Sequence, residues 1–426
     1  MTAKKINLVA VNMGYGHQRA AYPLRHLAGG EIITLNDYDG ISRSEKNFWE
    51  KSERSYNRLS RFKHVPLLGN LVFGLMDAFQ KIPPYYPWRD LSAPTVQQKY
   101  FYQAIKKGLG KALVEELNKS GLPWLTTFFV AAYVAEYHNY QGEIYCLVCD
   151  SDASRAWVPF SPRESRIKYL LPTERLKKRF LMYGLREENL FVSGFPLPLE
   201  NIGARREILL ADLSRRLNAL DPQGIFRARY KDLLAALLPA ALKKDKSAVT
   251  ITFAVGGAGA QTEIGAGLLK VLEAALKARE FNLNLVAGSR PEVRDYFITE
   301  IKKNGLSNAA NVKIIFAPNK LDYFKKFNQI LRATDILWTK PSELSFYCAL
   351  GLPFIISSPL GSQEDFNRDW LLSLDTGLDS LPLEYTAEWL PDLLVSGRLA
   401  RLALNGFLNA PLEGTSKIET LFKKSL

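Results

Sequence analysis

The chain has 426 residues, of which 47% are hydrophobic and 23% charged, and it carries a net charge of +13. This composition is that of a globular protein and excludes a disordered or fibrous chain, while the length predicts two or three domains. No apolar run reaches the ~20 residues that a membrane-spanning helix needs. The three cysteines are too few, and odd in number, for a disulfide framework, so we expect a reducing, cytoplasmic compartment.

The first 200 residues read as a parallel α/β domain. A strand, a glycine loop, a helix and a second strand fill the first 40 residues, which is the start of a βαβ unit. Further strands are expected at 124–130, 143–149, 166–172 and 189–198, and helices at 45–63, 97–119 and 173–184.

Within this domain, residues 42–111 form a basic insertion with 13 Lys or Arg against 5 Asp or Glu, a net charge of +8. Such a segment can meet an anionic membrane surface, a phosphorylated substrate or nucleic acid, or it can be a solvated helical face. An apolar stretch at 65–80 can lie on a membrane or form a buried helix. Nucleic acid is disfavoured because no repeat of aromatic and basic residues on a sheet is visible.

Residues 201–245 are charged and helical, with a break at Pro222 and Gly224, and we expect them to link two domains. The alternation then restarts, with strands at 249–255, 283–288, 312–317, 335–339 and 353–357 and helices at 262–279, 291–304, 321–333 and 343–350. A helical tail is expected at 372–426. Together these elements predict an α/β fold of two Rossmann-like, doubly wound domains, at 1–200 and 246–371, facing each other across a cleft.

A glycine loop follows the first strand of each predicted domain, and neither loop is a dinucleotide fingerprint. Arg19 stands where the first loop needs a third small residue, and Thr262 stands there in the second. Neither loop carries the lysine of a P-loop, so dehydrogenases and P-loop kinases are both disfavoured. The second loop can still cradle a diphosphate next to a helix N-terminus, or it can be a tight strand-to-helix turn.

Cys146 and Cys149 form a C-x-x-C pair inside an apolar, strand-like run. No second Cys or His pair follows at zinc-finger spacing, so we interpret them as two strand thiols. The four histidines make an all-His metal site improbable on numbers alone, and no metal site is expected.

Several segments, in order along residues 6–371, together resemble the GT-B glycosyltransferases, in the group of the monogalactosyldiacylglycerol synthases and the peptidoglycan UDP-N-acetylglucosamine transferase. The opening loop is similar to a Gly-rich loop ending in His, and FAVGGAGA resembles the glycine loop of the nucleotide domain. Four further motifs are similar to those of the group: VCDSDASRAW (148–157), LVAGSR (285–290), DILWTKPSEL (335–344) and PLGSQEDFNRDWL (359–371).

The resemblance implies an inverting, metal-independent transfer of a sugar from a nucleotide diphosphate donor, expected to be a UDP-sugar, to a lipid-type acceptor. His17 is the candidate general base because an unperturbed imidazole has a pKa of ~6.5. Asp150 is implied as the carboxylate that fixes its tautomer, with Asp152 as the second choice. The residues implied at the acceptor are Gly14, Tyr15, Gly16 and Trp157. Without the resemblance, His17 reads as a helix-start residue satisfied by backbone.

On the donor side, the amides of the second loop and the helix that follows can meet the charge of the leaving group. The implied nucleotide-sugar residues are Gly256, Gly257, Ala258, Gly259, Arg290, Lys340, Ser342, Glu343, Gln363, Glu364 and Asn367. Ser342 and Glu343 replace two glycines of the family, and Phe346 or Cys348 falls where the family has a ribose-binding Glu. Glu343 is the candidate for that contact. Gln363, Glu364 and Asn367 can bind sugar hydroxyls or cap a helix. No cofactor is expected beyond the nucleotide-sugar substrate.

Three other functions stay open. The changed glycines favour a GT-B-like protein without transferase activity that binds a nucleotide or a glycan. A nucleotide-sugar epimerase is disfavoured because no His lies beyond His138. A nucleic-acid-binding protein is supported only by charge. For the leading function we expect a cytoplasmic protein that associates peripherally with the inner face of the membrane through residues 42–111.

Overall fold

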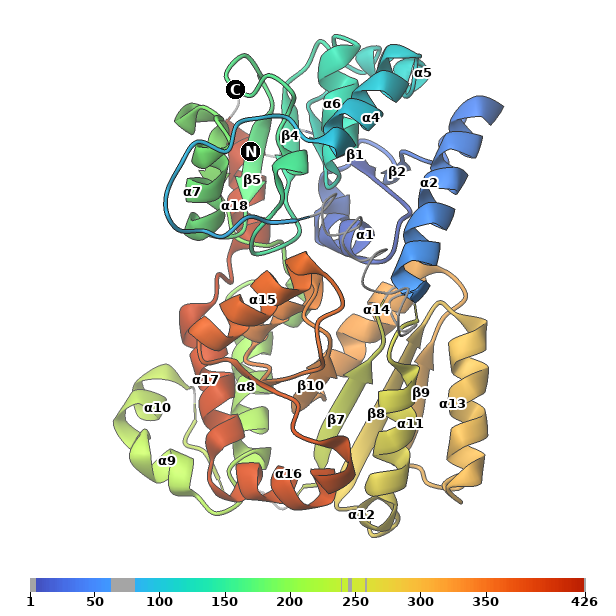
Figure 1. Cartoon of the computed structure of the whole chain (residues 1–426). Coiled ribbons are helices and arrows are strands. Elements are labelled where there is room, and N and C mark those ends of the chain that lie inside the picture. The colour runs from blue at the N-terminus through green and yellow to red at the C-terminus, as the bar shows by residue number, and fades with distance from the viewer. Residues whose placement is uncertain (1–4, 63–80, 239, 244–246, 257–258, 425–426) are drawn as a thin grey trace. The chain divides into compact units, whose positions relative to one another are not determined.

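The computed structural model describes residues 5–62, 81–238, 240–243, 247–256 and 259–424. The chain divides into two compact units: the first comprises 1–197, 360–367 and 413–426, and the second 198–359 and 368–412. Each unit contains one six-stranded sheet in which every strand pair is parallel (Figure 1). The predicted α/β class with two doubly wound, Rossmann-like sheets is therefore confirmed.

The first sheet has the strand order β2-β1-β3-β4-β5-β6. Its strands are β1 (Asn7–Ala10), β2 (Ile33–Thr34), β3 (Trp124–Thr126), β4 (Ile144–Leu147), β5 (Lys168–Leu171) and β6 (Leu190–Val192). These runs are short and almost continuously apolar, as is typical of strands that are buried on both faces of a parallel sheet.

The helices of the first unit connect these strands. They are α1 (Gly16–Ala21), α2 (Arg43–Phe62), α4 (Val96–Lys106), α5 (Lys111–Asn118), α6 (Phe129–Tyr137), α7 (Glu174–Met182) and α18 (Gly414–Lys424), with 3₁₀ turns η1 (Tyr22–Leu27), η2 (Arg155–Trp157) and η3 (Glu187–Asn189). The helix expected at 97–119 is two helices because the chain turns at Gly108 and Gly110, which both have positive φ. The strand expected at 124–130 ends at Thr126, and α6 was not foreseen: it is apolar on every side, so it shows no helical period.

The second sheet has the strand order β12-β11-β10-β7-β8-β9. Its strands are β7 (Val249–Ala254), β8 (Phe281–Gly288), β9 (Val312–Phe316), β10 (Ile336–Thr339), β11 (Phe354–Ile356) and β12 (Gly377–Asp379). Numbered from β7, this order is the 3-2-1-4-5-6 arrangement of a doubly wound nucleotide-binding domain.

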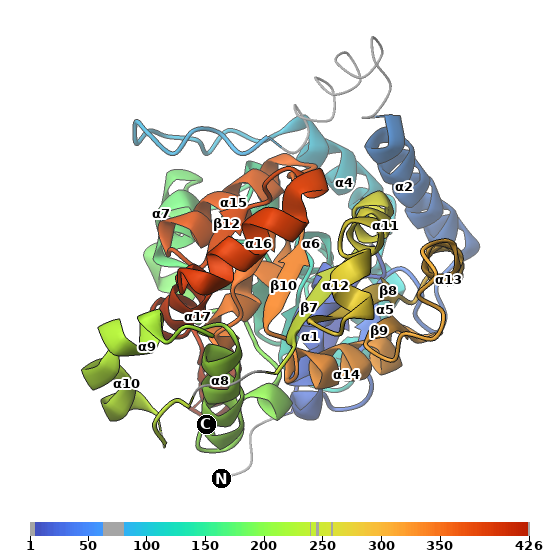
Figure 2. The ribbon, with the colours of Figure 1, turned by 90° about the horizontal axis from the view of Figure 1, so that it is seen from below.

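Helices cover both faces of the second sheet, with α11 and α12 on one face and α14 on the other (Figure 2). The helical elements of the unit are η4 (Leu199–Asn201), α8 (Glu207–Ala219), α9 (Ile225–Arg229), α10 (Lys231–Leu237), α11 (Thr262–Val271), α12 (Glu273–Lys277), α13 (Pro291–Lys303), α14 (Lys320–Leu331), η5 (Glu343–Leu350), η6 (Leu383–Tyr385), α16 (Thr386–Val395) and α17 (Arg398–Asn409). The helix expected at 343–350 is a 3₁₀ helix. A further helix, α15 (Ser362–Ser373), begins in the first unit and ends in the second.

The described part of 201–245, the segment that the sequence assigned to a linker, contributes side chains to the core of the second unit. Leu213, Leu217 and Phe226 belong to its hydrophobic cluster. Arg216 is buried, and its guanidinium donates to the carbonyl oxygens of Leu331, Thr334, Leu350 and Gly351. The charge of α8 therefore does not mark a solvated segment, because backbone carbonyls satisfy the arginine inside the protein.

Two segments distant in sequence complete the first unit. Thr415 donates to the carbonyl of Leu197 at 2.6 Å, and the ring of Phe422 meets that of Tyr145 edge to face at 5.0 Å. The sequence placed residues 360–367 in the nucleotide domain and 413–426 in a separate tail, because neither segment carries a local signal of its packing partner.

No helix in the described ranges is both long and apolar enough to cross a bilayer. The apolar stretch at 65–80 lies outside the described residues, so its two interpretations stay predictions.

A buried ion pair stands behind the carboxyl end of β4. Asp152 accepts two hydrogen bonds from Arg179 of α7, at 2.9 and 2.8 Å, and both side chains are almost fully buried. Arg179 also donates to the carbonyl of Pro83 at 2.8 Å. This fork-to-fork geometry commits Asp152 to a structural role.

We expect Arg179→Met to lower the free energy of unfolding of the first unit by about 3 kcal/mol, because it removes the bidentate partner of the buried Asp152 carboxylate and leaves only Arg175, at 3.6 Å, as a counter-charge. Urea unfolding measures the change. The matched control is Lys177→Met on the same helix, whose partner Glu187 is exposed, and which should cost at most about 1 kcal/mol. Equal effects of the two substitutions would contradict this assignment.

Candidate active site

The candidate base lies where the first sheet reverses its strand order. The chain passes from β1 to β2 on one side and returns to place β3 on the other side of β1. In open α/β sheets, ligands bind outside the carboxyl ends of the strands at such a switch point. The loop carrying His17 leaves β1 at this edge, and the loop carrying Asp150 leaves β4, two strands away.

His17 is held by the backbone of the neighbouring strand connection. Gly14 turns the chain with a φ of +75°, which favours glycine, and α1 then begins at Gly16. The Nδ1 atom of His17 lies 2.5 Å from the carbonyl oxygen of Thr127, directly after β3. Because a carbonyl oxygen can only accept, Nδ1 carries the proton. In the neutral ring, Nε2 is then the nitrogen with the lone pair, as a general base requires.

Aromatic rings surround this imidazole. The ring of Phe128 meets it edge to face at 5.0 Å, and Trp157 lies 6.0 Å away between centroids. The structure thus brings together His17 and Trp157, two residues that the sequence assigned to one site. Tyr15 of the same loop is buried. The Sγ atom of Cys149 lies 3.8 Å from Nδ1 of His17.

The cysteines are internal thiols. All three are free and buried, and burial raises the pKa of Cys146 above its usual range and that of Cys348 to about 12. Cys146 and Cys348 are therefore protonated at neutral pH, in keeping with the interpretation of Cys146 as a strand thiol.

Asp150 is fixed by an amide from α15. Asn367 donates from Nδ2 to the Asp150 carboxylate at 2.9 Å, and its Oδ1 accepts from the backbone N–H of Ser151 at 2.8 Å. Asn367 is fully buried and belongs to the first unit, whereas the sequence assigned it to sugar hydroxyls in the nucleotide domain. The role of fixing the His17 tautomer, which the sequence gave to Asp150, is performed by the carbonyl of Thr127. Asp152, the second choice for that role, instead accepts hydrogen bonds from Arg179.

The other two α15 candidates also lie in the first unit. Glu364 is buried, and its carboxylate accepts from the backbone N–H of Leu360 at 2.7 Å. This bond ties Glu364 to the loop that precedes α15. Gln363 is half-buried in the first turn of the helix.

The second unit has its own switch point, between β7 and β10. The glycine loop leaves β7 there, Lys340 directly follows β10, and Arg290 follows β8 on the other side of β7. Because all these strands are parallel, the three segments leave the sheet at the same edge. The predicted nucleotide residues are therefore gathered by the topology.

The two described glycines of the loop are the points where cationic side chains approach it. The loop closes as a turn, with Gly259 N–H donating to the carbonyl of Gly256 at 2.8 Å. A Cβ atom at Gly256 would stand 2.4 Å from Cε of Lys340, and one at Gly259 would stand 3.4 Å from Cδ of Arg290. Glycine at 256 thus leaves room for the end of the Lys340 side chain, and a larger residue there would displace it. Gly257 and Ala258 lie outside the described residues.

This arrangement suits an anion. Lys340 and Arg290 bring two positive charges to the loop, and α11 begins at Thr262, so its N-terminal N–H groups follow directly. Arg290 also forms an ion pair with Glu292 at 3.2 Å. Cations, backbone N–H groups and a helix N-terminus are the features that bind phosphate groups in proteins.

The candidates for the ribose contact differ in burial. Phe346 and Cys348 are buried in the core of the second unit, so neither is placed to bind a nucleotide. Ser342 and Glu343 are half-buried at the start of η5. Glu343 remains the acidic candidate next to the loop that carries Lys340.

Two residues of these sites were missed from the sequence. Thr127 contacts His17 through its backbone carbonyl. Every residue has this group, so the residue type gives no signal of the contact. Gly265 of α11 allows the close approach of helix and strand that the sequence sought at position 262: its Cβ would stand 3.0 Å from Cδ1 of Phe253 and 2.8 Å from Cε1 of Phe297. A search for small residues one turn further into the helix would have found Gly265.

The fold and these two loops define an α/β protein with two doubly wound sheets and a phosphate-type cradle on the second. No protein-family model matches the chain, and no curated protein sequence matches it. Among solved structures, the chain is similar to several at low sequence identity.

Three solved structures illustrate the likeness. The UDP-GlcNAc 2-epimerase of Neisseria meningitidis bound to UDP-GlcNAc is 16% identical, covers 81% of this chain and 84% of its own, and has a TM-score of 0.45. MurG of Acinetobacter baumannii is 12% identical over 99% of both chains, with a TM-score of 0.47. HepE of Anabaena in complex with UDP is 13% identical over 99% of both chains, with a TM-score of 0.46. Likenesses this weak assign no activity to the chain.

The His17 geometry predicts its tautomer. We expect long-range ¹⁵N–¹H correlation spectra above the titration range to show His17 protonated at Nδ1, because its partner there is a carbonyl. His138 is the internal control: its Nε2 lies 3.0 Å from the carbonyl of Leu109, so it should show the opposite tautomer. A His17 ring protonated at Nε2 alone would contradict the site.

Proposed function

We propose that the protein is an inverting, metal-independent glycosyltransferase that moves a sugar from a UDP-sugar to a lipid-type acceptor. The observation that carries the proposal is the glycine loop at the switch point of the second sheet, with Lys340 against Gly256 and Arg290 against Gly259. The loop offers a diphosphate two cations and the N–H groups at the start of α11.

The chemistry divides between the two units. In the first, Nε2 of His17 takes the proton of the acceptor hydroxyl as its oxygen forms a bond to the anomeric carbon of the donor. The bond from that carbon to the diphosphate oxygen breaks in the same step, and the configuration inverts. In the second unit, Lys340 and Arg290 meet the charge that develops on the departing diphosphate.

Asp150 supports the base side of this reaction in the proposal. Its carboxylate lies in the loop after β4 and is oriented by the buried amide of Asn367. A fixed negative charge near the imidazole would stabilise the imidazolium that forms during proton transfer. Trp157, next to His17, would offer the acceptor an aromatic surface.

The proposal is tested on the donor side by calorimetric titration with UDP, GDP, ADP and dTDP, with and without magnesium. We expect UDP to bind without magnesium and Lys340→Ala to weaken binding about ten- to a hundredfold, because a charge-assisted contact is lost. Lys270→Ala is the matched control, since Lys270 is exposed in the last turn of α11, and it should leave the affinity unchanged.

Further outcomes separate the parts of the proposal. Absence of nucleotide binding at millimolar concentration would end the transferase assignment. An affinity for UDP that survives Glu343→Ala would remove only the ribose contact. The second candidate, a nucleotide-binding protein without transferase activity, is favoured by the replacement of the family's glycines with Ser342 and Glu343. It predicts UDP binding together with no turnover of any UDP-sugar.

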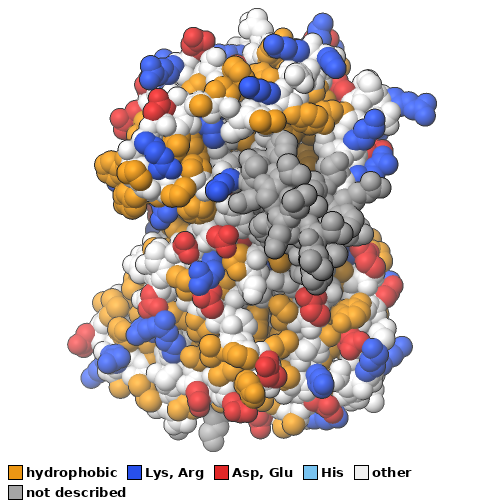
Figure 3. All heavy atoms as spheres, in the orientation of Figure 1, with side chains coloured by type: hydrophobic (Ala, Val, Ile, Leu, Met, Phe, Trp, Pro, Cys, Tyr) orange, Lys and Arg blue, Asp and Glu red, His pale blue; other side chains and the backbone are white. Residues whose placement is uncertain are grey.

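The acceptor side supports an anionic membrane surface as a partner. Within the basic insertion, Tyr86 and Trp88 are 70% and 64% exposed, and their rings stack at 6.3 Å. Lys178 of α7 lies over the Trp88 ring at 5.8 Å, and the segment is anchored to α7 where Leu91 N–H donates to the carbonyl of Met182. Figure 3 shows Lys and Arg side chains among apolar ones over the visible face of the first unit. Exposed tyrosine and tryptophan rings next to basic groups suit the boundary between lipid head groups and acyl chains.

We expect the protein to bind vesicles that contain anionic lipid at low salt and to be released as the salt concentration rises. Replacing Tyr86 and Trp88 together by Ser should weaken binding in a co-sedimentation assay, because the interfacial rings are lost. Tyr385→Ser in the second unit, 54% exposed, is the control. Equal partitioning onto neutral and anionic vesicles at low salt would refute the membrane assignment.

A further inference from the structure

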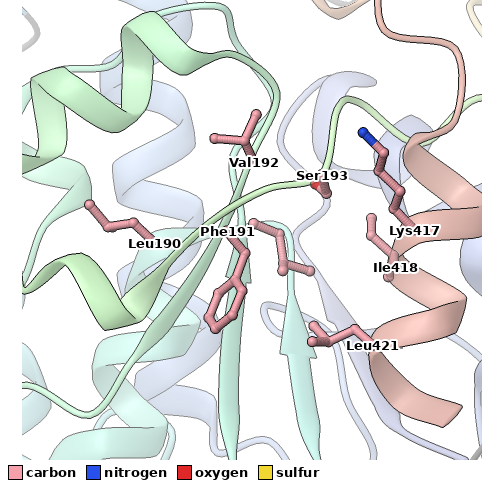
Figure 4. A pocket seen from close by; sticks show the side chains of 8 residues that line it. Leu190, Phe191, Val192, Ser193, Lys417, Ile418 and Leu421 are labelled. Carbon is pink, nitrogen blue, oxygen red and sulfur yellow. The ribbon is translucent and has the colours of Figure 1, made fainter. Parts of the chain in front are cut away.

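A hollow of about 350 Å³ lies beside β6, the edge strand of the first sheet (Figure 4), and three strands separate β6 from β1, which the His17 loop follows. Its lining comes from the sheet and from α18. The residues are Leu170, Leu190, Phe191, Val192, Ser193, Lys417, Ile418 and Leu421. Six of these eight are apolar, one carries a hydroxyl and one carries a charge.

The register of the sheet explains the place of Leu170 and Phe191 in this lining. Leu170 of β5 pairs with Phe191 of β6, so both side chains point to the same face. Phe422 of α18 packs on Tyr145 at 5.0 Å, which places α18 on one face of the sheet. Phe191 is only half-buried because β6 has no further strand beside it. The hollow is therefore an apolar floor left uncovered between the sheet edge and the helix.

The charge in this hollow is placed asymmetrically. Figure 4 shows Lys417 at the Ser193 end of the hollow and Leu421, one helical turn further on, at the other end. On α18, Glu419 is engaged by His26 at 2.6 Å and lies 4.0 Å from Lys423. Glu413 lies one turn before Lys417, whose backbone N–H donates to the Glu413 carbonyl, and Glu413 is not part of the lining. The Ser193 hydroxyl donates to the carbonyl of Gly194 at 2.8 Å. Lys417 is thus the group in the lining that can meet a negative charge.

We propose that this hollow binds a small amphipathic anion, with a short alkyl chain along Leu170, Phe191 and Leu421 and a carboxylate or phosphate head at Lys417. Its volume falls at the lower end of the ~300–1,000 Å³ typical of small-molecule sites. Burial of the alkyl chain supplies the binding free energy, in proportion to the apolar area removed from water. The single ammonium group fixes the direction of the chain.

Calorimetry with four probes tests the site, using the full chain and concentrations below micelle formation: octanoate, octyl phosphate, octanol and inorganic phosphate. We expect both octyl anions to bind more tightly than octanol and inorganic phosphate to bind too weakly to measure. Lys417→Gln should weaken the two anions about tenfold and leave octanol unchanged, because only the charge-assisted contact is lost. A preference between octanoate and octyl phosphate distinguishes a fatty acid from a phospholipid as the source of the ligand.

Two further variants make the test specific. Leu421→Gln should weaken all three octyl compounds, since it removes apolar surface from the hollow. Lys423→Gln, on the same helix but next to Glu419, should change none of them. Equal affinities of Lys417→Gln and Lys423→Gln for octanoate, or no octanoate binding at all, would overturn the proposal. UDP titration of the same variants reports on the second unit, so its failure and the failure of this site are read separately.

Discussion

Parallel strands end at one edge of a sheet, and both candidate sites of this protein depend on that constraint. His17, Thr127 and Asp150 lie far apart in sequence but each follows a strand of the first sheet. Gly256, Arg290 and Lys340 do the same in the second. The edge becomes usable only where the strand order reverses, because there two successive loops diverge to opposite faces of the sheet. The strand order thus decides where each candidate site lies, and the residue types in the loops decide what each site can bind.

The two switch points are equipped for opposite tasks. In the first unit, a backbone carbonyl accepts a hydrogen bond from Nδ1 of His17. The other ring nitrogen, Nε2, therefore carries the lone pair that can accept a proton. In the second unit, the side chains of Lys340 and Arg290 pass close to Gly256 and Gly259, and α11 begins three residues after Gly259. In the proposed reaction, the first site receives a proton and the second meets negative charge. A group transfer that produces an acid and an anionic leaving group needs both.

Five of the six strands of the second unit could be predicted to within two residues, because runs such as VTITFA, ILWT and FII are apolar, β-branched and bounded by turns. The gathering of Gly256, Arg290 and Lys340 followed from the same pattern. The sixth strand, β12 (Gly377–Asp379), was missed, because it lies in the segment that was expected to be a helical tail. Contacts that depend on long-range packing could not be predicted. Asn367 was taken for a sugar ligand because an amide reads hydroxyls well, yet Asp150 and Ser151 N–H occupy it. Residues 201–245 were taken for a linker because they are charged, yet Arg216 within them is buried and donates to four backbone carbonyls.

The first unit is built from segments at both ends of the chain, and this bears on the order in which the chain can fold. Its sheet is finished by Leu197, but Thr415 and Phe422, which pack against Leu197 and Tyr145, come more than 200 residues later. During synthesis from the N-terminus, this face of the first sheet stays uncovered while the whole of the second unit is being made. The second unit, whose strands all lie between residues 249 and 379, can close first. The first unit, although synthesised first, therefore completes its fold after the second unit. Until then, its exposed apolar face is the surface on which a chaperone would act.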